Sequence, residues 1–214
     1  MLPVFIGYDP RQPLAYNVCQ SSLMRRSSKP LAITPLVLKA LPIGRAGLTE
    51  FTFSRFLVPF LCGYAGRAVF MDADIVVTGD IAELFELADP DAAVSVVQNE
   101  RRFEWPSAMV FNNELCKQLT PELIERGNPF DFSWAGKIGA LPAEWNHLVG
   151  YDQPQEPKLI HYTQGIPCWP ETEGCELAKR WHKEHTYMNS TVAYKDLMGS
   201  SVHDKHVKAR LKAA

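Results

Sequence analysis

Short apolar runs that end in turn-forming or polar residues alternate with helical periodicity in the first part of the chain. The pattern predicts strands over residues 3–7 and 31–38, with a helix over residues 13–26 between them. A strand–helix–strand unit indicates two parallel strands joined by a right-handed crossover. We therefore expect an α/β fold whose first strand ends in a Gly-Tyr-Asp turn.

The apolar run over residues 68–71 is followed by two carboxylates, Asp72 and Asp74. A run this short between turn residues predicts a buried central strand, and open α/β sheets bind ligands at the carboxyl ends of such strands. Because side chains alternate along an extended chain, both carboxylates point to one face. They repel each other unless a cation lies between them, so the pair predicts a site for a hard divalent cation such as Mg²⁺. A solvated turn is the alternative.

The rest of the chain completes one domain, because it has no internal repeat and no linker long enough to divide it. We expect this domain to span residues 1–185, followed by a partly basic extension over residues 186–214. Residues 100–104 are expected to form a charged, exposed connection. The further elements that the pattern predicts are helices over residues 52–64, 80–87, 115–126 and 177–185 and strands over residues 92–97, 107–113 and 158–162.

Composition narrows the class of protein. The net charge of −2 gives the chain no overall positive field, so we expect no nucleic-acid partner. No apolar run reaches the roughly 18 residues that cross a bilayer, and the first residues lack a signal peptide's basic segment and cleavage site. The five cysteines form no Cys-x-x-Cys pair, which gives no zinc signature and fits a reducing cytosol. We expect a cytoplasmic protein.

Three more residues are candidates for binding a nucleotide. Tyr8 and Asp9 follow the first predicted strand, where a base or ribose could lie, although a plain turn would give the same pattern. Arg55 is the one cation in an otherwise apolar predicted helix. Its guanidinium could pair with a phosphate or with the two aspartates, or extend to solvent.

Four stretches, in order, resemble the family-8 glycosyltransferases, the glycogenin and bacterial lipopolysaccharide galactosyltransferase type. They are residues 52–59, residues 68–84 with the Asp-Ala-Asp motif, the Leu-Pro-Ala-Glu-Trp-Asn of residues 141–146, and residues 160–169. The resemblance implies a GT-A fold with a mainly parallel central sheet flanked by helices. It also implies a hexosyltransferase that moves a sugar from a nucleotide donor, most often UDP-linked, to an acceptor hydroxyl with retention of configuration.

The same resemblance implies roles for individual residues. Asp72, Asp74 and His161 would hold a divalent metal, usually Mn²⁺ and otherwise Mg²⁺, so that both aspartates take part in catalysis. The donor-binding residues would be Tyr8, Asp9, Arg55, Asp72, Ala73, Gly165 and Trp169. The side chains that line the sugar and acceptor side would be Trp145, Asn146 and Trp169.

The chain also departs from the family pattern. Pro167 stands where the family has a lysine that binds a phosphate, so the diphosphate charge must be met elsewhere. The candidates are the metal itself or one of the cations Arg11, Lys137 and Lys158. The family's Asp-Gln pair is absent as well, and Asp131 is the nearest carboxylate that could serve as a catalytic residue.

Two other functions remain open. In a haloacid-dehalogenase-type phosphatase, Asp72 would be the nucleophile and Asp74 the acid/base, but that fold opens with this strand, whereas here about seventy residues precede it. A non-catalytic nucleotide-sugar-binding protein would explain the missing lysine. The acceptor, which could be a glycan, a lipid or a protein, is not indicated. The cations of the tail could touch anionic lipid weakly or form a solvated terminus; they are Lys205, Lys208, Arg210 and Lys212.

Overall fold

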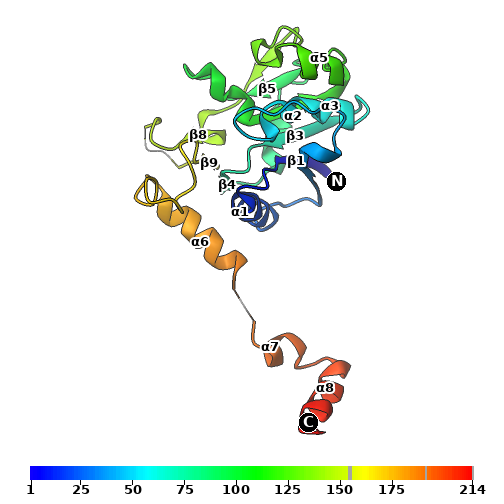
Figure 1. The fold of residues 1–214 in the computed structure, drawn as a ribbon, viewed down its shortest axis with the longest axis vertical. Helices are drawn as coiled ribbons and strands as arrows, with labels where there is room; N and C mark the ends of the chain where they lie inside the picture. Colours follow the sequence, from blue (N-terminus) through cyan, green and yellow to red (C-terminus); the bar gives the residue numbers. More distant parts are fainter. Residues whose placement is uncertain (154–155, 191, 214) are drawn as a thin grey trace.

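The computed structural model describes residues 1–153, 156–190 and 192–213, and its centre is a six-stranded sheet of order β2-β1-β3-β6-β5-β7 (Figure 1). The strands are β1 (Leu2–Gly7), β2 (Leu31–Leu36), β3 (Arg67–Met71), β5 (Val94–Val96), β6 (Ala108–Asn112) and β7 (Ile138–Ala140). β1 is parallel to β2 and β3, and β5 is parallel to β7, whereas β6 runs antiparallel to both of its neighbours. The expected mainly parallel sheet is therefore confirmed, with one antiparallel strand in its middle.

A second sheet of three strands, in the order β4-β9-β8, lies beside the first. Its strands are β4 (Ile75–Val77), β8 (His147–Leu148) and β9 (Leu159–His161). β4 follows β3 almost at once, so the two aspartates occupy the turn by which the chain leaves the central sheet. β9 pairs antiparallel with β4 and sets His161 opposite Ile75. The sequence pattern predicted the strand that becomes β9 but not β4.

Most of the predicted helices are shorter in the structure than the sequence pattern predicts, whereas the one expected over residues 177–185 extends to residue 188. The helices are α1 (Pro13–Met24), α2 (Phe51–Ser54), α3 (Val58–Leu61), α4 (Ala82–Leu87), α5 (Pro121–Arg126), α6 (Ala178–Met188), α7 (Tyr194–Met198) and α8 (Val202–Ala213). The helix predicted over residues 52–64 is broken into α2, a 3₁₀ turn and α3, and Pro59, which has no backbone N–H, lies in the first turn of α3. The helix predicted over residues 115–126 begins only at Pro121, where the Thr120 hydroxyl accepts a hydrogen bond from the Leu123 N–H.

The strand that precedes the aspartates is completely buried in the core from Ala68 onward. Ala68, Val69, Phe70 and Met71 are all 0% exposed, as the apolar run predicts. The backbone N–H of Asp72 continues the pairing with β6 by donating to the Ser107 carbonyl (2.9 Å). The end of β3 is therefore fixed by packing and by hydrogen bonds, which makes it a rigid support for the side chains that follow.

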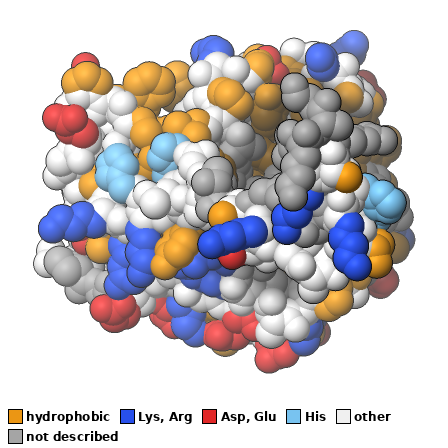
Figure 2. Space-filling model, turned by 90° about the horizontal axis from the view of Figure 1, so that it is seen from below, with side chains coloured by type: hydrophobic (Ala, Val, Ile, Leu, Met, Phe, Trp, Pro, Cys, Tyr) orange, Lys and Arg blue, Asp and Glu red, His pale blue; other side chains and the backbone are white. Residues whose placement is uncertain are grey.

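The end of the chain extends from the body in Figure 1, where α7 and α8 lie beyond α6 and away from both sheets. Figure 2 shows the face at this end, with Lys and Arg side chains across its middle and Asp and Glu side chains along its lower edge. Of the four basic residues of the tail, the side chains of Arg210 and Lys212 lie outside the described part. Within the described residues, no helix combines the length and the apolar character that a membrane span requires. The predicted lipid contact stays a prediction.

Candidate functional site

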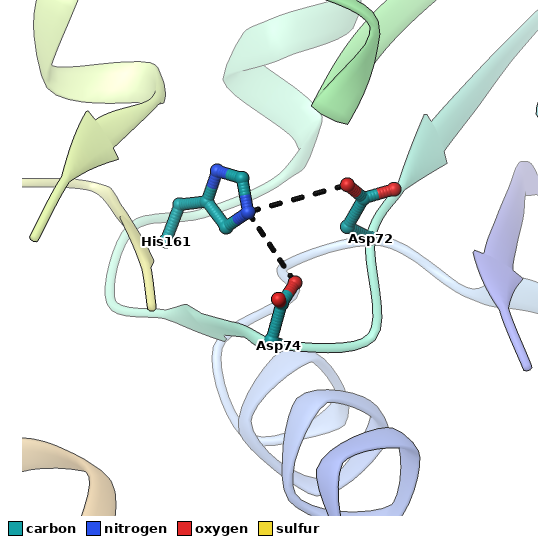
Figure 3. A group of neighbouring side chains, drawn as sticks. All are labelled: Asp72, Asp74 and His161. Atoms are coloured by element: carbon teal, nitrogen blue, oxygen red, sulfur yellow. Dashed lines mark ion pairs between the residues drawn. The ribbon is translucent and has the colours of Figure 1, made fainter. Parts of the chain in front are cut away.

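Asp72, Asp74 and His161 come together where the β3–β4 turn meets the end of β9, and their side chains point toward one another (Figure 3). The Nε2 atom of His161 lies 3.4 Å from Oδ1 of Asp74 and 4.0 Å from Oδ2 of Asp72. One potential ligand atom from each residue lies within 4.8 Å of the others. Asp72 and His161 are buried, whereas the side chain of Asp74 is 23% exposed and opens the cluster to solvent.

Backbone hydrogen bonds fix this arrangement. The Tyr162 N–H donates to the Asp74 carbonyl at 3.0 Å, which ties the end of β9 to the β3–β4 turn. The pairing of His161 with Ile75 places the histidine across the small sheet from the residue that follows Asp74. The three side chains therefore meet because β9, far away in the sequence, pairs with β4.

Burial and mutual charge dominate the electrostatics of the cluster. Burial raises the pKa of Asp72 to about 7, although the Arg55 guanidinium opposes this shift. Burial alone would lower the pKa of His161, but the carboxylates of Asp74, Asp72 and Glu104 outweigh it and raise this pKa to about 9. A cation bound beside Asp72 would stabilise the charged form of this carboxyl, which burial disfavours.

The donor atoms fit a divalent metal ion. Oδ1 of Asp72 and Oδ1 of Asp74 are buried and make no hydrogen bond within the described part of the chain, and Nε2 of His161 faces both carboxylates. Two carboxylates and one imidazole are a ligand set that Mn²⁺ accepts, and Mg²⁺ accepts the carboxylate oxygens readily. The residues predicted to hold the metal are thus brought together, while the identity of the ion stays a prediction.

Arg55 lies beside the cluster and does not extend to solvent. Its Nη1 lies 3.2 Å from Oδ1 of Asp72 and donates to the Pro106 carbonyl at 3.0 Å. The sequence left a phosphate, the aspartates and solvent open as its partner, and the structure shows the aspartate. A contact between Arg55 and a donor stays a prediction.

Asp9 is fully buried at the end of β1 and is held by Arg11. Its carboxylate accepts hydrogen bonds from the Arg11 N–H and Nε (both 2.9 Å), from Nη2 (2.6 Å) and from the Glu50 N–H (3.2 Å). These contacts lower the pKa of Asp9 to about 2. Tyr8 packs edge-on against Tyr16 and lines a pocket of about 520 Å³ between the loops that follow β1 and β2.

A second pocket, of about 410 Å³, opens at the metal-ligand cluster. Asp74 lines it together with Arg11, Thr163, Gly165 and Trp169. Gly165 adopts φ +118°, a conformation that favours glycine, and a Cβ there would lie 3.4 Å from the Trp169 ring. Of the predicted donor-binding residues, Gly165 and Trp169 thus share a pocket with Asp74, whereas the side chain of Ala73 is buried.

Other predicted residues lie apart from this pocket. Asp131 is exposed, and its carboxylate accepts a hydrogen bond from the Ser133 N–H (2.8 Å); among the described residues it makes no hydrogen bond or ion pair with the cluster. Trp145 and Asn146 are both 0% exposed, so neither lines the pocket in this conformation. Lys137 pairs with Asp89 and Lys158 pairs with Glu83, which leaves Arg11 as the candidate cation that lines the pocket with Asp74.

The sequence analysis missed Glu104. Residues 100–104 were expected to form an exposed connection, and this is wrong for Glu104, which is only 9% exposed. Its Oε2 lies 3.8 Å from Nδ1 of His161, and its Oε1 accepts a hydrogen bond from the Thr163 hydroxyl. The available signal was its place directly before the Trp-Pro-Ser that leads into a buried strand.

The sequence model described as Glycosyl transferase family 8 matches residues 33–126. Protein CDI from Arabidopsis thaliana is 35% identical over 219 residues, and the match covers 85% of each chain. The chain belongs to glycosyltransferase family 8. This membership favours sugar transfer over the phosphatase alternative.

Solved structures show the same fold. The WbbM bifunctional glycosyltransferase superposes on 86% of this chain with a TM-score of 0.65 and 17% identity. The chain spans about half (49%) of the WbbM chain. The galactosyltransferase LgtC, solved with donor and acceptor sugar analogs, superposes on 91% of this chain and 99% of its own, with a TM-score of 0.62 and 9% identity. The GT-A fold expected from the sequence is therefore confirmed.

Proposed function

We propose that this family-8 glycosyltransferase moves a hexose from a UDP-linked donor to an acceptor hydroxyl, with retention of configuration and with Mn²⁺ or Mg²⁺ as cofactor. The observation that carries the proposal is the buried cluster of Asp72, Asp74 and His161, which opens through Asp74 into a pocket. LgtC, which shares the fold, was solved with donor and acceptor sugar analogs. The same two classes of ligand are proposed here.

The three residues of the cluster would hold the cation. When bound, the cation offsets the negative charge that builds up on the leaving diphosphate. Arg55 keeps Asp72 in place and favours its ionised form, because its guanidinium lies against both carboxylate oxygens. Asp74, the most exposed of the three ligands, lies where the cluster meets the pocket and therefore closest to a bound donor.

The two pockets suit different parts of the nucleotide-sugar donor. Tyr8 lines the pocket beside β1 and β2, which suits a flat, partly apolar nucleoside. Arg11 and Asp74 line the second pocket, which suits a diphosphate and its metal ion. The exposed Trp169 ring lies at this second pocket, and an aromatic face suits the C–H surface of a sugar. The acceptor could be a glycan, a lipid or a protein.

Calorimetric titration of UDP tests the proposal. UDP should bind wild-type protein in Mn²⁺, and binding should fall sharply in EDTA and in the Asp74→Asn variant. Binding of UDP that ignores both the metal and Asp74 would contradict the proposed site. Absence of UDP binding to the metal-loaded wild type would contradict the donor class.

A turnover assay separates an enzyme from the non-catalytic alternative. A panel of UDP-hexoses is incubated with the protein and Mn²⁺, and release of UDP is followed. Metal-dependent release from one donor above the others supports sugar transfer and identifies the sugar. Tight UDP binding with no release from any donor, even with glycan acceptors added, would favour a binding protein.

A further inference from the structure

Glu104 is a third buried carboxylate at the cluster, and it lies on the opposite side of the histidine ring from the two aspartates. It comes from the 3₁₀ turn Arg102–Ser107 that precedes β6. Its Oε2 lies 3.8 Å from Nδ1 of His161, whereas Nε2 of the same ring faces Asp72 and Asp74. Each of the two ring nitrogens of His161 therefore faces at least one carboxylate.

The carboxylate of Glu104 is held in place by neighbours from two other segments. The Thr163 hydroxyl, two residues after the end of β9, donates to Oε1 of Glu104 at 2.5 Å. The backbone carbonyl of Glu104 accepts hydrogen bonds from the Ser107 hydroxyl (2.5 Å) and from the Asn146 amide (3.3 Å). The buried Asn146, expected from the sequence to line the sugar side, thus braces the turn that carries Glu104.

Burying the Glu104 carboxylate costs free energy unless a neighbouring group offsets its charge. Among the described residues, no Lys or Arg forms an ion pair with Glu104, although Asp72 has Arg55 and Glu184 has Arg25 and Arg26. A buried carboxylate without a basic side chain beside it destabilises the fold. Nδ1 of His161 faces Oε2 of Glu104 at 3.8 Å and is itself buried with no hydrogen bond among the described residues, so the two groups are placed to serve each other as partners.

The chemistry of imidazole explains what a carboxylate beside Nδ1 does. A neutral imidazole has one N–H and one lone pair, and a metal ion binds the nitrogen that bears the lone pair. When Nε2 binds the metal, the proton lies on Nδ1, which is the nitrogen that faces Glu104. A carboxylate on that N–H fixes the tautomer and the ring orientation, and it makes the metal-binding nitrogen more basic.

We propose that Glu104 is a positioning residue, supported by Thr163, that holds His161 with its Nδ1–H toward Glu104 and its Nε2 lone pair toward the cation bound by Asp72 and Asp74. The inference rests on the proposed metal site. Glu104 itself does not touch the metal or the substrate in this role. It acts through His161 alone.

Direct measurement of Mn²⁺ affinity tests this role without any assay of activity. The EPR signal of free Mn²⁺ is followed as the metal alone is added to wild type, Glu104→Gln, Glu104→Leu and Thr163→Val. Losing an outer partner of a metal-binding histidine typically weakens affinity by about 10-fold to 100-fold. We expect such a loss for Glu104→Leu, a smaller one for Glu104→Gln, and the smallest for Thr163→Val.

Glu184→Gln is the matched control, because Glu184 is also a buried glutamate but pairs with Arg25 and Arg26, at the end of α1. Its loss should destabilise the fold and leave Mn²⁺ affinity unchanged. If Glu104→Leu does not fold, Glu104→Gln and Thr163→Val carry the test. Unchanged Mn²⁺ affinity in folded Glu104→Gln and Thr163→Val would overturn the inference.

The tautomer of His161 provides a signature that a merely structural role would not move. Long-range ¹H–¹⁵N spectra of metal-free, ¹⁵N-histidine-labelled protein, at a pH high enough for the ring to be neutral, should show the proton of His161 on Nδ1, and Glu104→Leu should shift this population. The same tautomer in both proteins would overturn the inference. If wild type binds no Mn²⁺ at all, the proposed metal site fails with it; if wild type binds and the variants match it, only the role of Glu104 fails.

Discussion

Arg55 and Asp72 form a buried ion pair in which Nη1 of the arginine lies 3.2 Å from Oδ1 and 3.3 Å from Oδ2 of the aspartate. Only 9% and 10% of the two side chains is exposed. The arginine therefore offsets much of the penalty of burying a carboxylate at the end of β3. In this role Arg55 supports the proposed metal site by holding one of its ligands in place.

Replacing Arg55 should lower the stability of the folded protein. At pH 8, where Asp72 with its pKa of about 7 is mostly ionised, Arg55→Met should lower the free energy of unfolding by about 3 kcal/mol. The reason is that the variant leaves a buried carboxylate without its partner. Urea denaturation with EDTA present measures the change.

The double variant Arg55→Met/Asp72→Asn is the control for this prediction. Once the carboxylate is gone, the arginine has less to stabilise, so the double variant should be more stable than the sum of the two single changes predicts. Additive effects of the two changes would show that the ion pair does not contribute to stability.

The part of the site that could be predicted from sequence is the part that is local. Asp72 and Asp74 lie two residues apart after an apolar run, and both the strand and the shared direction of the carboxylates follow from that spacing. Tyr8 and Asp9 follow their strand in the same way. Each predicted strand is present within a few residues of its expected bounds.

Contacts between distant segments could not be read from the sequence. His161 joins the aspartates only because β9 pairs with β4, and the sequence analysis supplied it by resemblance to a family. Glu104 looked like part of a solvated charged run, yet its burial depends on Thr163 and Asn146 much later in the chain. Periodicity describes one element at a time, so it gives no information about such partners.

Arg11 is predicted to contact the donor diphosphate. It lines the same pocket as Asp74, and its side chain is 67% exposed. Because a hydrogen bond to a charged group contributes about 1.5–3 kcal/mol, Arg11→Ala should weaken UDP binding by about 10-fold or more. Uridine binding should change little, because uridine has no phosphate. Calorimetry with both ligands measures the two effects.

Lys137→Ala and Lys158→Ala are matched controls, since these cations pair with Asp89 and Glu83 instead of lining this pocket. Both should leave UDP binding near the wild-type value. An equal loss of uridine and UDP binding in Arg11→Ala would show that Arg11 acts through Asp9 and the nucleoside pocket, and would contradict the phosphate contact.

Asp9 should make the stability of the folded protein depend on pH in the acidic range. Its pKa of about 2 in the folded protein lies below the value of 3.8 for the free side chain, because Arg11 and two backbone N–H groups bind the carboxylate. A lowered pKa stabilises the fold above pH 3.8, and this contribution is lost as the pH falls toward 2. Since Arg11 is largely exposed and screened by solvent, we expect the contribution to be about 1–2 kcal/mol.

Comparison of wild type with Asp9→Asn measures this dependence. Urea denaturation at pH 5 should show wild type to be the more stable protein, and the difference between the two should shrink as the pH is lowered to about 2. A difference that stays constant over this range would show that the Asp9 carboxylate does not titrate with folding.

Metal binding should stabilise the folded chain. A ligand present at about 100 times its Kd adds about 2.7 kcal/mol to the free energy of unfolding. For a domain of this size that corresponds to a rise in Tm of about 5–10 °C. Calorimetric scans should show the rise when Mn²⁺ replaces EDTA, and Asp74→Asn should abolish it. A similar rise in Asp74→Asn would show that Mn²⁺ binds elsewhere.

The folded catalytic unit is predicted to end with α6, a few residues beyond the boundary at 185 that the sequence suggested. Glu184 is buried, and its carboxylate accepts hydrogen bonds from Arg25 (2.7 Å) and Arg26 (2.6 Å) at the end of α1. Trp181, only 1% exposed, packs into the core from the same helix. In contrast, α7 and α8 lie away from the sheets (Figure 1).

Truncation distinguishes the two parts of the C-terminal region. A chain ending at residue 190 should have a free energy of unfolding within about 0.5 kcal/mol of that of the full chain, because the helices it loses, α7 and α8, lie away from the packed body. A chain ending at residue 176 loses Trp181 and Glu184, leaves Arg25 and Arg26 without their partner, and should be destabilised by at least about 3 kcal/mol. Urea denaturation of the three proteins measures both effects. If the chain ending at 190 were as unstable as the chain ending at 176, α7 and α8 would belong to the folded unit, and the boundary after α6 would be wrong.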